Sequence, residues 1–187
     1  MVKRKFLMRL SAFFFEIIPI SFFFIGSQYF NLIIAATISI ITSIIVIITF
    51  YILEKRFSNF QIFSIRFLSI LLTLIAYFLN DENFIKIQPT IFNGFFSSVL
   101  LIGLFYKKAM MKKFFGTQFF LTNETWVKLS LRWGIFFLFL SITNEFAWRN
   151  LSTENWVFVK VFFLMPLVGI FMLAQLPLTL KGSIKNK

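Results

Sequence analysis

Residues 32–53 read LIIAATISIITSIIVIITFYIL, a stretch that is apolar almost throughout and carries no charged residue. A helix needs about 20 such residues to cross roughly 30 Å of hydrocarbon. A membrane β-strand is about half as long and alternates apolar with polar residues. The stretch has the length and the continuous apolar character of the helix, so it predicts a transmembrane helix.

The whole chain has the composition of a membrane protein. Hydrophobic residues make up 59% and charged residues 14% of its 187 residues, and the mean hydropathy is +0.86. Soluble domains carry about 25% charged residues. Cys and His are absent from the sequence, which excludes disulfides, thiolate nucleophiles and His-based catalysis. The sequence therefore predicts a non-enzymatic protein that holds no cofactor and no metal.

Further apolar runs lie on both sides of this stretch. Together they predict an all-α, polytopic transmembrane helical bundle of about six spans, which forms a single membrane domain over residues 1–187. Five spans is the alternative, because Glu16 and Pro19 interrupt the first run, which would then be re-entrant or lie at the interface. The six expected spans cover residues 10–29, 32–53, 62–79, 89–106, 126–143 and 156–178.

The charged residues between the runs predict the orientation. The formal net charge is +12, and basic residues gather in alternate connections, with only Lys86, Arg149 and Lys160 on the opposite side. Because basic loops stay in the cytoplasm, both termini are expected there. The basic excess then has anionic phospholipid, and no nucleic acid, as its partner. The segment 107–121 mixes basic and apolar residues, so it is expected to lie as an amphipathic segment on the cytoplasmic face.

A set of polar side chains falls within the spans, in the cytoplasmic half of the predicted bundle. The set comprises Glu16, Arg66, Arg132 and Gln175. Ionisable groups inside a membrane usually face the bundle interior and pair, so we expect Glu16 to pair with Arg66 or Arg132. The alternatives are that the charged groups snorkel to the surface, or that the cluster serves a small transporter or a lipid-handling protein.

The most polar external loop permits two interpretations. Asp81, Glu82 and Lys86 could form an external contact loop for a partner in the cell envelope. Alternatively, Asp81 or Asn80 caps a short helical turn.

A stripe of small residues marks one face of the second span. Ala35, Ser39 and Ser43 recur every four residues. Small side chains on one face allow helices to approach closely. The stripe therefore predicts close packing inside the bundle, with a homo-oligomer seam as the alternative.

Three short blocks of sequence carry a family resemblance. They are Asp81-Glu82-x-Phe84-Ile85-Lys86 followed by Pro89-Thr90; Trp126, Leu129 and Trp133 followed by Phe136-Phe137 and Asn144; and Ser152-Thr153, Trp156-Val157, Lys160 and Ala174-Gln175. In these residues the chain resembles the intracellular septation protein A family of bacterial inner-membrane proteins. The resemblance implies a multi-pass protein of the cell inner membrane with roles in septation, cell envelope integrity and membrane homeostasis. It also implies association with the division and cell-wall elongation machinery, without an enzymatic activity.

Overall fold

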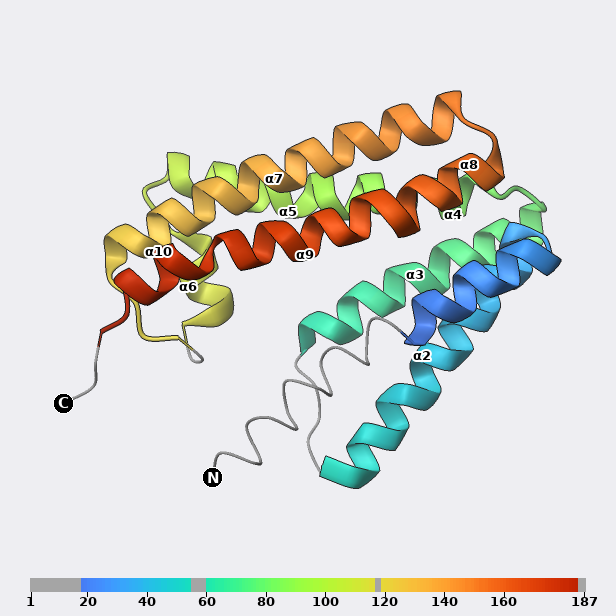
Figure 1. The fold of residues 1–187 in the computed structure, drawn as a ribbon, viewed down its shortest axis with the longest axis horizontal. Coiled ribbons are helices and arrows are strands. Elements are labelled where there is room, and N and C mark those ends of the chain that lie inside the picture. The colour runs from blue at the N-terminus through green and yellow to red at the C-terminus, as the bar shows by residue number, and fades with distance from the viewer. Residues whose placement is uncertain (1–17, 55–59, 117–118, 185–187) are drawn as a thin grey trace. The chain divides into compact units, whose positions relative to one another are not determined.

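The computed structural model describes residues 18–54, 60–116 and 119–184; within these, the side chains at positions 47, 50–54 and 60–68 lie outside the description. Helices make up almost all of this part of the chain (Figure 1). It contains no β-strand, and its one extended pairing is an isolated bridge between Leu121 and Ser183. The predicted class, an all-α membrane protein, is confirmed.

The chain divides into two compact units. The first comprises Met1–Gln88 and Leu151–Val157, and the second comprises Pro89–Asn150 and Phe158–Lys187. The helices of the first unit are a helix over residues 18–29, α2 (Leu32–Glu54), α3 (Phe60–Leu79), α4 (Asn83–Lys86) and the start of α8 (Thr153–Phe158). The second unit contains α5 (Gln88–Phe105), α6 (Met110–Phe115), α7 (Asn123–Asn150), the π-helix η1 (Val159–Leu164), α9 (Met165–Ala174) and α10 (Leu176–Lys181).

Small residues bring two helices of the first unit close together. A Cβ added to Gly26 would lie 3.3 Å from the Cα atom of Ala35, which is completely buried. Ser43 is also buried. At the start of α2, the side chain of Asn31 accepts a 2.9 Å hydrogen bond from the amide of Ile34, which caps the helix. Ala35 and Ser43 of the small-residue stripe are therefore used for packing inside this unit.

Two hydrophobic clusters fill the second unit. One gathers Leu121, Trp126 and Leu129 beneath α6, and the other gathers Phe136, Leu140 and Leu164 between α7 and the last helices. Phe171 stacks on Phe136 with ring centroids 3.8 Å apart. A close approach between α5 and α7 is marked by Gly134, because a Cβ there would lie 2.7 Å from the side chain of Leu101.

Within the described residues, three helices are long and apolar enough to cross a membrane. They are Asn83–Phe105, Asn123–Asn150 and Thr153–Lys181, and they overlap the predicted spans 89–106, 126–143 and 156–178. Shorter apolar helices cover Leu32–Val46 and Ser69–Leu79. Residues 10–17 of the first predicted span, 10–29, lie outside the described residues, so the total of six spans and the position of both termini remain predictions.

Candidate functional site

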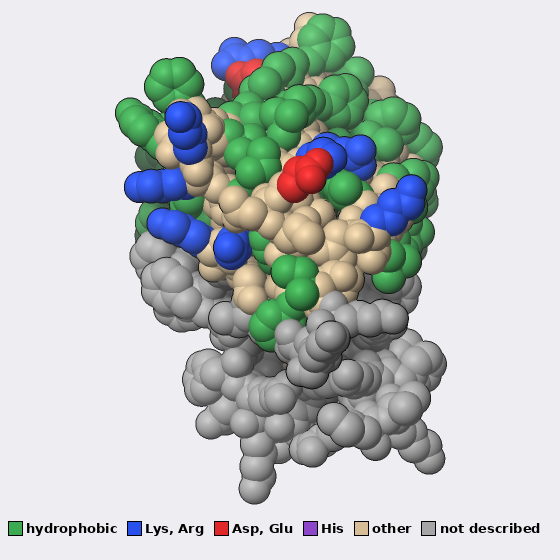
Figure 2. Space-filling view, turned by 90° about the vertical axis from the view of Figure 1, so that its left-hand side faces the viewer, with side chains coloured by type: hydrophobic (Ala, Val, Ile, Leu, Met, Phe, Trp, Pro, Cys, Tyr) green, Lys and Arg blue, Asp and Glu red, His purple; other side chains and the backbone are tan. Residues whose placement is uncertain are grey.

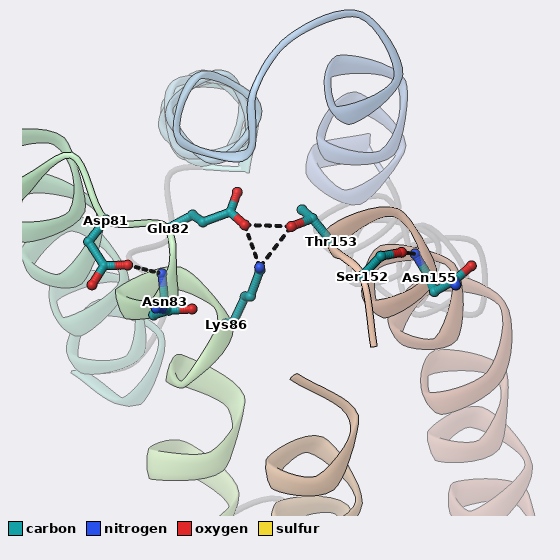
Figure 3. Close-up of polar contacts among 7 residues, drawn as sticks. All are labelled: Asp81, Glu82, Asn83, Lys86, Ser152, Thr153 and Asn155. Atoms are coloured by element: carbon teal, nitrogen blue, oxygen red, sulfur yellow. Dashed lines mark hydrogen bonds and ion pairs between the residues drawn. The ribbon is translucent and has the colours of Figure 1, made fainter. Parts of the chain in front are cut away.

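A buried polar contact joins two distant parts of the first unit. We call Glu82, Lys86 and Thr153 the polar junction. The Lys86 ammonium group donates hydrogen bonds to the Glu82 carboxylate and to the Thr153 hydroxyl, the latter at 2.7 Å, and Thr153 also donates to Glu82 (Figure 3). Lys86 is only 6% exposed. A buried ammonium group needs such partners to offset its lost hydration, so the junction attaches α4 to the start of α8.

The neighbouring polar residues stabilise the turns beside the junction. The carboxylate of Asp81 accepts a 2.9 Å hydrogen bond from the amide of Asn83, the first residue of α4 (Figure 3). Ser152 accepts one of 3.3 Å from the amide of Asn155 in the same way. The expected external contact loop thus contains one capping residue, Asp81, and two residues, Glu82 and Lys86, that bind each other.

Trp156 supports the junction from within α8. Its side chain is 1% exposed, and its ring meets the edge of Phe23 with centroids 6.5 Å apart. The packing of a large aromatic ring against the helix over residues 18–29 holds the first turn of α8 in place.

A second buried polar contact, in the second unit, is centred on Thr90. Asn144 is 1% exposed, and its amide group donates a 2.9 Å hydrogen bond to the Thr90 hydroxyl. Ser141 donates another of 2.9 Å to the backbone carbonyl of Thr90. Pro89 precedes Thr90 in the first turn of α5, where a missing N–H group costs least. This Thr90 cluster joins α5 to α7.

The predicted intramembrane cluster is described only in part. The guanidinium group of Arg132 lies 3.3 Å from the side-chain oxygen of Gln175. Gln175 is buried and also donates to the carbonyl of Phe171, whereas Arg132 is exposed. The structure therefore brings two of the four residues together. Glu16 and the side chain of Arg66 lie outside the described residues, so their pairing remains a prediction.

Two further motif residues lie on the facing helices of the second unit. The ring of Trp133 meets Phe171 edge-on at 5.0 Å and contacts both hydrophobic clusters. Lys160 is half-buried and lies within η1. A π-helical turn inside a longer helix is rare and is often found at functional positions.

One end of the second unit carries exposed basic residues, which we call the basic platform. Hydrophobic side chains lie among the Lys and Arg side chains on this face (Figure 2). The platform comes from the turn after α5, from α6, and from the ends of α7 and α10. Its members are Lys107, Lys108, Lys112, Lys113, Lys128 and Lys181. The expected amphipathic segment, 107–121, provides four of them, and among its described residues Met110–Phe115 is helical as α6.

Sequence reasoning missed one participant in these contacts, Ser141, whose partner Thr90 lies 51 residues away and which no motif marks. Thr153 belongs to the third sequence block, but nothing in the sequence indicated its contact with Glu82, 71 residues away. In the described part of the chain, no group of three or more acidic residues is placed to hold a metal ion.

Long apolar helices joined by buried polar contacts define a polytopic helical membrane protein. The chain belongs to the intracellular septation protein A family, whose profile matches residues 11–186. This confirms the resemblance found in the three sequence blocks. Several of the motif residues form the contacts above, namely Glu82, Lys86, Thr90, Asn144, Thr153 and Trp156.

Curated relatives carry the name inner membrane-spanning protein YciB. The protein of Brucella suis is 47% identical over 109 residues, which cover 58% of this chain and 54% of the relative. The protein of Mesorhizobium japonicum is 46% identical over 110 residues, or 59% of this chain and 49% of the relative. The matched region thus spans about half the length of these relatives. No solved structure matches the chain.

Proposed function

We propose that the protein is a non-enzymatic scaffold of the bacterial inner membrane, which supports septation, cell envelope integrity and membrane homeostasis through protein contacts within the membrane. One observation supports this proposal most strongly. Two buried polar side chains of the described helices bind other residues of the same chain: Lys86 binds Glu82 and Thr153, and Asn144 binds Thr90. Such pairing favours a packed bundle over a substrate pathway, which needs polar groups around a water-accessible cavity.

The proposed contact surface lies at the external end of the first unit. Tyr77, Phe78 and Leu79 are exposed at the end of α3, next to Asp81. Glu154 is exposed at the start of α8. Aromatic side chains beside acidic groups suit the membrane-proximal surface of another envelope protein. By family membership, the expected partners belong to the division and cell-wall elongation machinery.

In-cell photocrosslinking tests this proposal. A photoreactive residue at position 78 should capture membrane proteins of the division or elongation machinery, identified by mass spectrometry. The matched control places the same residue at the exposed position 170 in α9, which should not enrich them. The Asp81→Lys variant should lower the yield at position 78. Equal yields at both positions, or a yield that Asp81→Lys leaves unchanged, would contradict the proposed surface.

The proposed orientation places both termini in the cytoplasm. The sequence contains no cysteine, so single-cysteine variants can report exposure directly. A membrane-impermeant thiol reagent added to intact spheroplasts should label Glu154→Cys and should label Lys185→Cys only after lysis. Labelling of Lys185→Cys before lysis would overturn the orientation.

A small transporter or lipid-handling protein is the second candidate. The contact between Arg132 and Gln175 favours it, because this pair places a cationic group against a buried amide in the predicted cytoplasmic half. Under this alternative, Gln175→Ala would reduce lipid or solute movement in reconstituted vesicles and leave the crosslinks at position 78 unchanged. Under the scaffold proposal, vesicles with the native protein show no movement above that of protein-free vesicles.

A further inference from the structure

The basic platform concentrates positive charge on a defined surface. Its six lysines are exposed. Among the described residues at this end of the second unit, Glu124 is the one acidic group, and it pairs with Lys128 at 2.5 Å. The lysines on the α5–α6 turn, on α6 and on α10 have no acidic partner there, so the surface has a strong positive field.

Hydrogen bonds between backbone groups connect the chain segments beneath these lysines. The amide of Thr122 donates a 3.0 Å hydrogen bond to the carbonyl of Gly182, and the amide of Ile184 donates one of 2.8 Å to the carbonyl of Phe120. The hydrophobic cluster around Trp126, which is 2% exposed, lies directly below. A ligand that binds the lysines therefore does not have to order the backbone first, which preserves affinity.

Exposed apolar side chains surround the charges. Phe105 is 84% exposed, and Tyr106 beside it is exposed too. The segment after α6 and the end of α10 add further members of this set: Phe119, Phe120, Leu180 and Ile184. Lysines interleaved with aromatic and aliphatic side chains are typical of protein surfaces that lie in the headgroup region of a bilayer. A nucleic acid would match the charge and would leave these apolar groups in water.

We infer that the basic platform is a binding surface for the headgroups of anionic phospholipids, which its lysines hold while the neighbouring aromatic side chains enter the headgroup–acyl boundary. This inference stands independently of the proposed scaffold function. Each lysine near an anionic membrane surface strengthens binding by roughly fivefold. Removing four of them should reduce the preference for anionic over zwitterionic lipid by about tenfold or more.

The test measures lipid selectivity around the full chain reconstituted in phosphatidylcholine. Spin-labelled phosphatidylglycerol and spin-labelled phosphatidylcholine are compared by the fraction of motionally restricted lipid. The variant replaces Lys108, Lys112, Lys113 and Lys181 with Gln, and the matched control replaces the same four with Arg. Lys107 is left unchanged because its backbone has a positive φ of 57°, a conformation that is uncommon for residues other than glycine.

The expected result is a strong preference of the native chain for phosphatidylglycerol, which high salt weakens. The Arg control should keep this preference, and the Gln variant should lose it. The inference is overturned if the Gln variant keeps the native selectivity, or if the native chain shows none. Tighter binding of duplex DNA than of phosphatidylglycerol vesicles would also overturn it. The salt titration of the native chain tests the inference even if the Gln variant fails to fold.

Discussion

Lys86 and the lysines of the basic platform carry the same ammonium group in opposite surroundings. Lys86 is buried against Glu82 and Thr153, whereas the platform lysines are exposed. A buried ammonium group such as that of Lys86 needs fixed hydrogen-bond partners within the protein. An exposed ammonium group can instead bind water, ions or lipid headgroups in turn. The comparison teaches that surroundings, and not charge, separate a lysine that holds the fold together from one that meets the membrane.

The largest loss of stability is expected when the buried lysine, Lys86, is replaced. Lys86→Met removes the ammonium group and leaves the Glu82 carboxylate with the Thr153 hydroxyl and with water, since the Glu82 side chain is 37% exposed. We therefore expect a loss at the low end of the range for a broken buried pair, about 3 kcal/mol in the free energy of unfolding, measured by reversible unfolding in mixed micelles. The double variant Lys86→Met with Glu82→Gln should recover part of it. A loss below about 0.5 kcal/mol, the size typical of a surface pair, would show that Lys86 stabilises the fold no more than an exposed lysine does.

A second variant disturbs the platform without touching its charges. A Cβ added at Gly182 would lie 2.0 Å from the Thr125 hydroxyl oxygen. Gly182→Ala should therefore force the backbone pairing with Thr122 apart, at about 2 kcal/mol. Gly169→Ala is the matched control, because nothing lies within 4 Å of a Cβ there. Equal stability of the two variants would show that the C-terminal segment does not brace the platform.

A smaller loss is expected at the Thr90 cluster, where the buried group is polar but uncharged. Asn144→Ala removes the hydrogen bond to Thr90 and should lower the free energy of unfolding by about 1 kcal/mol, because hydrogen bonds between membrane helices are modest. A double-mutant cycle with Thr90→Val isolates this bond. Asn150→Ala removes an exposed hydrogen bond to the Phe146 carbonyl within the same helix and should have a smaller effect. A coupling energy of zero in the cycle would refute the proposed contact.

The smallest effect on stability is expected for the exposed ion pair between Glu124 and Lys128. Glu124 and Lys128 are 77% and 53% exposed, so Lys128→Gln should change the free energy of unfolding by less than about 0.5 kcal/mol. The same micelle experiment measures it. A loss of stability as large as that of Lys86→Met would show that exposed and buried lysines do not differ in their contribution to the fold.

The helices could be predicted because their signal is local. The apolar run 32–53 lies within α2, since lipid requires every backbone group to pair inside the segment. The cap at Asp81 was also one of the two interpretations of its loop, because a carboxylate reaches an amide two residues away.

The contacts between distant residues could not be predicted in the same way. Lys86 follows Glu82 by one helical turn, which suggests a pair, but nothing local shows that Thr153 completes it 67 residues later. The bond between Asn144 and Thr90 spans 54 residues, and it depends on how α5 and α7 pack. Burial of Lys86 likewise results from tertiary packing, so the sequence, which placed Lys86 in a possible external contact loop, could not show that its side chain is buried.

The π-helix η1 has a consequence for the numbering of the last helix. A π-helical turn holds one residue more than an α-helical turn, so the residue that faces a given direction after η1 is displaced by one position along the sequence. A helical wheel drawn at about 100° per residue over Thr153–Lys181 would therefore place Phe171 and Gln175 roughly 100° away from the face on which they contact Phe136 and Arg132. Face assignments in this helix, and alignments with relatives, need to count that extra residue.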